Sequence, residues 1–177
     1  KSLGFGGWIS AAAALAVLKA GRRTAPDPLC QGLKRSLSMR GKLVVGNWKM
    51  NGGLQANASL LASLRAGWTV ADGRVMVVCV PFPYLAQARD ALSGSVVAWG
   101  AQDVSAHAAG AYTGEVSGAM IAEFGARYVL VGHSERRVLH DETDGEVAGK
   151  ALAALRAGLT PIVCVGEPED DRLLGRA

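Results

Sequence analysis

The hydrophobic residues of this chain fall into short runs that end in glycine or in polar residues. The runs are rich in valine and leucine, which is typical of strands buried on both faces of a parallel sheet. They cover residues 42–46, 75–80, 96–99, 128–131 and 160–165. Between the runs, apolar residues recur at helical spacing. This spacing predicts helices from Leu54 to Gly67, over 84–92, from Ser117 to Gly125, over 142–157 and over 169–174.

Strands and helices that alternate at intervals of about 30 residues predict an α/β fold, in which right-handed crossovers connect parallel strands. Two architectures fit this alternation, a doubly wound sheet and a (β/α)8 barrel. In both of them, functional side chains gather at the carboxyl ends of the strands. The sequence has neither a GxGxxG nor a Walker pattern after the first strand, which counts against a nucleotide-binding sheet.

Polar side chains follow two of the predicted strands directly. His133 comes after the run 128–131 and the turn residue Gly132, and an imidazole there can donate to a carbonyl or shuttle a proton. Asn47 and Lys49 follow the first run. Because side chains alternate along a strand, both are expected on one side of it. The alternative interpretations are structural, namely a histidine that only satisfies a loop backbone and a lysine that only pairs with Glu135.

Five short strings connect these residues to a known family. They are NWKMN at 47–51, QDVS at 102–105, TGE at 113–115, VGHSER at 131–136 and CVGE at 164–167. In order and spacing they match triosephosphate isomerases, and the chain resembles that family from about Met39 to its end. The resemblance favours the TIM barrel over the doubly wound sheet.

The resemblance also implies a reaction and the residues that serve it. The reaction would interconvert dihydroxyacetone phosphate and glyceraldehyde 3-phosphate through an enediolate, without a cofactor or a metal. His133 would polarise the substrate oxygens, and Lys49 would attract the phosphate and stabilise the enediolate. Asn47 would hydrogen-bond a substrate oxygen. Glu135 would support Lys49, and Ser134 would help to orient the histidine turn.

A complete (β/α)8 barrel takes about 250 residues and eight units. Residues 41–177 contain five predicted units and the start of a further helix, so we expect an incomplete TIM barrel. By resemblance, the catalytic glutamate and the phosphate-binding turns belong to later units, and Glu167 is not expected to be the base. We therefore expect this chain by itself to be inactive and, with two unpaired sheet edges, poorly soluble. The alternative function is a non-catalytic scaffold or binding module.

The resemblance also implies a role for the long segment between the third strand and the helix that follows it. In this family, a loop containing residues like Thr113, Gly114 and Glu115 inserts into a partner subunit, so a homodimer is expected. His107 and His140 lie in predicted loops without a second ligand at metal spacing, and both are expected to be solvated.

Charge and cysteine content limit the other possibilities. The formal net charge is +4, but residues 1–40 contain seven Lys or Arg against one acid, so the remainder carries −2. Residues 1–40 are interpreted as a leader outside the fold, too weakly apolar to span a membrane, with a targeting segment as the alternative. The near-neutral remainder argues against nucleic-acid binding. Cys79 and Cys164 lie inside apolar runs, which predicts buried thiols and fits a reducing cytoplasm.

Overall fold

The computed structural model describes residues 42–69, 74–166 and 174. The strands of this part are β1 (Leu43–Asn47), β2 (Val75–Val80), β3 (Ala98–Ala101), β4 (Tyr128–Val131) and β5 (Thr160–Val163). The helices are α2 (Leu54–Gly67), the 3-10 turn η2 (Phe82–Tyr84), α3 (Leu85–Leu92), α4 (Gly118–Glu123), α5 (Ser134–Leu139) and α6 (Asp144–Arg156).

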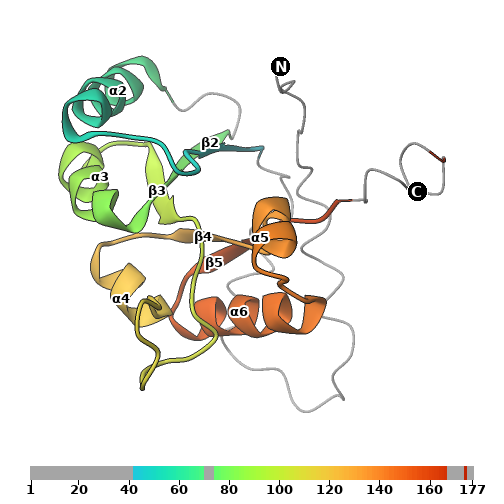
Figure 1. Cartoon of the computed structure of the whole chain (residues 1–177). Coiled ribbons are helices and arrows are strands. Elements are labelled where there is room, and N and C mark those ends of the chain that lie inside the picture. Colours follow the sequence, from blue (N-terminus) through green and yellow to red (C-terminus); the bar gives the residue numbers. More distant parts are fainter. Residues whose placement is uncertain (1–41, 70–73, 167–173, 175–177) are drawn as a thin grey trace, which may run out of the picture.

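The strands form a single parallel sheet in the order β1-β2-β3-β4-β5. The sheet curls, with α2, α3, α4 and α6 covering its outer face (Figure 1). A doubly wound sheet has a point at which the strand order reverses, and this sheet has none in its described part. The expected fold class, an incomplete TIM barrel, is therefore confirmed.

Alternation along the strands separates two apolar layers. On β2, Val78 and Val80 face the helices and join the main core, whereas Val77 and Cys79 face the inside of the curl. Cys79 and Cys164 are free and buried, as the sequence predicted. The central strands are the most buried, and β1 and β5, the outer strands of the described sheet, are mainly half-buried.

Several element bounds differ from the sequence prediction. β3 runs two residues further than expected because its pairing with β4 includes Gly100, where a Cβ would lie 2.3 Å from the carbonyl oxygen of Tyr128. Hydrophobicity alone does not identify a glycine as a strand residue. α6 begins only at Asp144, and its N-terminus is closed by a capping box between the N-cap residue Thr143 and Glu146 in the first turn. The short helix α5 was not predicted.

Three expectations lie outside the described residues: the leader 1–40, the helix over 169–174 except for its last residue, and the position of Glu167. Within the described part of the chain, no helix combines the length and the apolar character needed to cross a membrane.

Candidate active site

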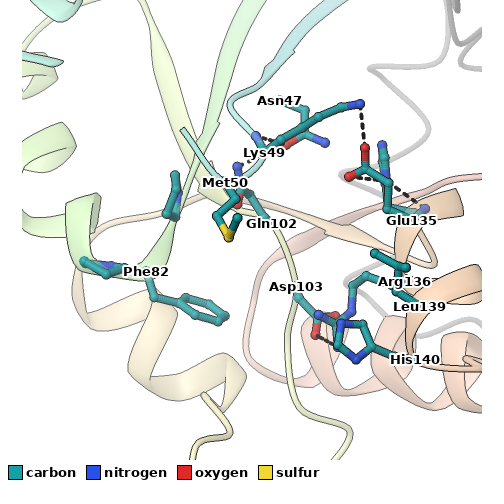
Figure 2. A pocket seen from close by; sticks show the side chains of 13 residues that line it. Asn47, Lys49, Met50, Phe82, Gln102, Asp103, Glu135, Arg136, Leu139 and His140 are labelled. Carbon is teal, nitrogen blue, oxygen red and sulfur yellow. Dashed lines mark hydrogen bonds and ion pairs between the residues drawn. The ribbon is translucent and has the colours of Figure 1, made fainter. Parts of the chain in front are cut away.

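A pocket of about 370 Å³ opens at the carboxyl ends of the strands. Asn47 at the end of β1, Lys49 just after it and Glu135 on α5 line one part of this pocket (Figure 2). His133, which follows β4, lines the same pocket. The parallel sheet thus brings together four residues that the sequence singled out. The remaining lining includes apolar and aromatic side chains, among them Met50, Phe82 and Leu139, and the exposed ring of His140.

The backbone of Lys49 has a left-handed conformation with φ of 52°. This corrects the expectation that Lys49 projects into the site as a strand residue two positions after Asn47. β1 ends at Asn47, and the chain then turns. The Asn47 Oδ1 accepts a hydrogen bond from the Lys49 amide at 2.9 Å and another from Gln102 Nε2 at 3.0 Å. With its oxygen engaged twice, Asn47 offers its Nδ2 hydrogens to a ligand.

Lys49 and Glu135 form the ion pair that the sequence suggested, with 2.7 Å between Nζ and Oε1. Both side chains are about half exposed, 52% and 49%. The hydrogen bond from Lys49 holds the pKa of Glu135 below its usual value, and the nearby His133 adds to this effect. A pair this exposed adds little to stability. Its effect is to fix the position of an ammonium group at the mouth of the pocket.

His133 caps the N-terminus of α5, where its Nδ1 accepts a hydrogen bond from the Glu135 amide at 3.3 Å. Only an unprotonated nitrogen can accept such a bond, so in the neutral ring the proton is on Nε2. The carboxylate of Glu135 lies 3.5 Å from the same Nδ1, but its closer partner is Lys49. We therefore assign the amide as the partner of Nδ1, which leaves Nε2–H as a hydrogen-bond donor.

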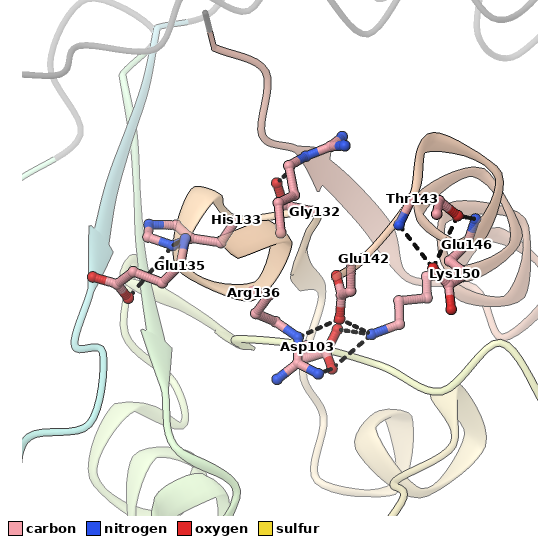
Figure 3. Close-up of polar contacts among 10 residues, drawn as sticks. Asp103, Gly132, His133, Glu135, Arg136, Glu142, Thr143, Glu146 and Lys150 are labelled. Carbon is pink, nitrogen blue, oxygen red and sulfur yellow. Dashed lines mark hydrogen bonds and ion pairs between the residues drawn. The ribbon is translucent and has the colours of Figure 1, made fainter. Parts of the chain in front are cut away.

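Four charged side chains form a cluster (Figure 3), and two of them, Asp103 and Arg136, also line the pocket. Lys150 of α6 donates to both Asp103 and Glu142, and Arg136 of α5 pairs with the same two carboxylates. Burial raises the pKa of Asp103 above its usual value. Burial acts in the same direction on Glu142, but hydrogen bonds from Lys150 and Arg136 outweigh it and hold the pKa of Glu142 low. The cluster joins the start of the long third loop to α5 and α6.

The other predicted residues do not enter this part of the pocket. Ser134 is the first residue of α5 and is exposed. Thr113, Gly114 and Glu115 lie on an exposed loop, in which the rings of His107 and Tyr112 stack at 3.9 Å. Sequence reasoning missed Gln102 as a partner of Asn47, and it missed the charged cluster. Gln102 stood within a family-like string, but its direction could not be inferred from pattern alone.

Among the described residues, no group of three or more His, Cys, Asp or Glu side chains is arranged to hold a metal ion. The curled parallel sheet, with an imidazole, an ammonium and an amide at its carboxyl ends, defines a protein of the βα-barrel class with a polar site where such barrels bind substrates.

Comparison with known proteins identifies the family. The triosephosphate isomerase family model matches residues 42–177. A triosephosphate isomerase of Bordetella pertussis is 66% identical over 133 residues, which are 75% of this chain and 53% of that protein. One of Cupriavidus necator is 61% identical over 137 residues, 77% of this chain and 55% of that protein. The chain belongs to the triosephosphate isomerase family.

A crystal structure supports the same assignment. The triosephosphate isomerase from Bartonella henselae superposes with a TM-score of 0.71 and 38% sequence identity, over 76% of this chain and 56% of that one. The chain spans about half the length of these relatives.

Proposed function

We propose that the whole protein is a triosephosphate isomerase, which interconverts dihydroxyacetone phosphate and D-glyceraldehyde 3-phosphate. A proton moves between adjacent carbons and the intermediate is an enediolate. The family assignment supports this proposal, and the observation that carries it is the convergence of Asn47, Lys49 and His133 at one pocket. Nothing observed favours the alternative of a non-catalytic scaffold.

His133 is the electrophile in this proposal. Negative charge develops on the substrate oxygens as the carbon-bound proton leaves, and a donor already aimed at them stabilises that charge without reorganising. The Glu135 amide holds the proton of the neutral ring on Nε2, the nitrogen that is left to donate. A neutral histidine that polarises the substrate carbonyl is the device established for triosephosphate isomerases.

Lys49 supplies positive charge to the same intermediate and to the substrate phosphate. Its ion pair with Glu135 is exposed, so an incoming dianion competes for the ammonium group in a well-solvated setting. Asn47 donates to a substrate oxygen through Nδ2. The general base is assigned to no residue of this chain, because by resemblance the glutamate that takes the proton belongs to a later βα unit.

The proposal includes a homodimer in the cytoplasm, with residues 41–177 as the barrel part and 1–40 outside it. The loop with Thr113, Gly114 and Glu115 is exposed and would insert into the partner subunit. The stacked His107 and Tyr112 rings would limit the conformations of the free loop and so reduce the entropy lost on association. An active monomer in sedimentation at micromolar concentration would rule out the dimer.

The function is tested by a triose phosphate assay on the whole protein and its variants. We expect Lys49→Met and His133→Gln each to lower kcat/KM by at least about 10²-fold, the effect of removing one preorganised charge-stabilising group. Lys42→Met is the matched control. It removes an exposed lysine just before the same strand, at the amino end of the barrel, and should leave turnover unchanged. Full activity in the Lys49 variant would refute the proposal.

A further inference from the structure

The left-handed backbone of Lys49 has to be imposed by its surroundings. A residue with a Cβ adopts such a conformation at a cost in energy and keeps it only where neighbouring contacts determine it. On the upstream side, the Asn47 side chain binds the Lys49 amide. The downstream side is the turn 50–53, which leads into α2. What holds this turn therefore also holds the lysine.

Asn51 closes the turn locally, since its Nδ2 donates a hydrogen bond to the Trp48 carbonyl oxygen at 2.9 Å. Asn57 connects the turn to α2. It lies on the inward stripe of α2, one helical turn before the buried Leu61, yet it is a polar residue with only 3% of its surface exposed. Its Oδ1 accepts a hydrogen bond from the Gly53 amide at 3.1 Å. Gly53, at the N-cap position, has no side chain with which to cap the helix. The side chain of Asn57, one turn into α2, therefore provides the hydrogen bond at this end of the helix.

Asn57 also ties the turn to the next βα unit. Its Nδ2 donates to Gln87 Oε1 of α3 at 3.0 Å, and Gln87 Nε2 donates in turn to the carbonyl oxygen of Leu54 at 2.7 Å. Gly52 fits closely against the same group, since a Cβ there would lie 2.9 Å from Asn57 Oδ1 and 2.7 Å from the Tyr84 ring. The turn after Lys49 is thus held by two helices.

We propose that Asn57 and Gln87 are positioning residues for Lys49. They keep the turn 50–53 docked on α3 and thereby keep the Lys49 ammonium at the pocket, where it is 2.7 Å from Glu135. Neither of them lines the pocket. The proposal rests on the function proposed above, because the position of Lys49 matters only if the lysine binds a charged substrate.

The test uses Asn57→Leu and Gln87→Met in the whole protein, which keep side-chain volume and remove the hydrogen bonds. We expect each to lower kcat/KM for D-glyceraldehyde 3-phosphate by about tenfold, since a small misplacement of a charged group costs that much or more. In a protein that already carries Lys49→Met, the same changes should lower kcat/KM by less than about twofold, because effects that act through one residue are not additive once that residue has been replaced. Ser63→Ala, on the exposed face of α2, is the control.

Hydrogen exchange adds a measurement that does not depend on activity. Asn57→Leu and Gln87→Met should speed exchange of the Lys49 amide, which bonds to Asn47 and not to the altered side chains. A role limited to capping α2 would lower Tm and leave both Lys49 exchange and kcat/KM unchanged, and that result overturns the proposal. If Asn57→Leu does not fold, Gln87→Met alone decides. An unaffected Lys49→Met variant would instead refute the proposed function.

Discussion

Gly132 connects β4 to His133, and replacing it by alanine tests how tightly the catalytic turn is packed. Its φ is 68°, in the left-handed region that favours glycine. A Cβ at this position would lie 2.7 and 2.8 Å from the two terminal methyl carbons of Val147, which is 3% exposed in the main core. A further contact, at 3.2 Å, would be with Arg137 Nη2. The alanine therefore meets two separate penalties.

The magnitudes of the two penalties can be estimated. The left-handed backbone costs an alanine about 1–2 kcal/mol, and forcing a methyl group into a packed core costs about 1–3 kcal/mol. We expect Gly132→Ala to lower the free energy of unfolding by about 2–5 kcal/mol, the sum of the two. Gly158 allows the backbone penalty to be measured without the steric one, because its φ is 76° and no atom lies within 4 Å of the position that a Cβ would take. Gly158→Ala should cost only the backbone term of about 1–2 kcal/mol.

The assay is urea unfolding of the whole protein, followed by circular dichroism, for both alanine variants. Adding Val147→Ala to Gly132→Ala should remove the steric penalty. The free energy of unfolding of the double variant should then fall by about 1–3 kcal/mol less than the sum of the decreases in the two single variants. Gly132→Ala should also lower kcat, because His133 is the next residue. Equal losses of stability at Gly132 and Gly158, or strict additivity with Val147→Ala, would refute the packing argument.

Two further predictions concern buried titratable groups. The cations beside Glu142 hold its pKa below the usual 4.5, so its stabilisation is fully present above pH 4.5 and is lost as the pH falls through the lower folded value. Glu142→Gln removes hydrogen bonds to charged groups, so it should lower the free energy of unfolding in urea by about 2 kcal/mol near pH 7. The difference in stability between the variant and the unaltered protein should shrink in acid. A difference that does not depend on pH would contradict this. Burial, with a smaller contribution from Cys164, raises the pKa of Cys79 to about 12. Because only the thiolate reacts, iodoacetamide at pH 8 should alkylate Cys79 at least about 100-fold more slowly in the native protein than in the urea-unfolded protein. Alkylation of native Cys79 at the unfolded rate, measured by mass spectrometry, would show that the strand opens readily.

The sequence by itself determined the parallel α/β character and the end of the sheet at which the site lies. Valine-rich runs separated by helical spacing require strands covered on both faces, and polar residues directly after such strands must lie at their carboxyl ends. Asn47 and His133 were identified on that basis. The pairing of Lys49 with Glu135 was also anticipated, but on the premise that a buried lysine needs a carboxylate, whereas the lysine side chain is 52% exposed.

Other features depended on hydrogen bonds of side chains, which the hydrophobic pattern does not reveal. The left-handed turn at Lys49 is accompanied by hydrogen bonds from the Lys49 amide to Asn47 and from Asn51 to the Trp48 carbonyl oxygen, and hydrophobic periodicity does not reveal either bond. α5 is short and polar, so its residues have no periodicity to detect, and it is capped by the imidazole of His133.

The register of β3 and the charged cluster were likewise decided by tertiary structure. Gly100 pairs as a strand residue because only a glycine can lie so close to the Tyr128 backbone. Glu142 was expected to begin a helix, but it precedes α6 and pairs with Lys150, eight residues later, and with Arg136 of α5. Periodicity reports which side of an element is buried. Which side chains meet across elements is settled only when the βα units pack together, because those distances are fixed by the sheet's curl and the helices against it.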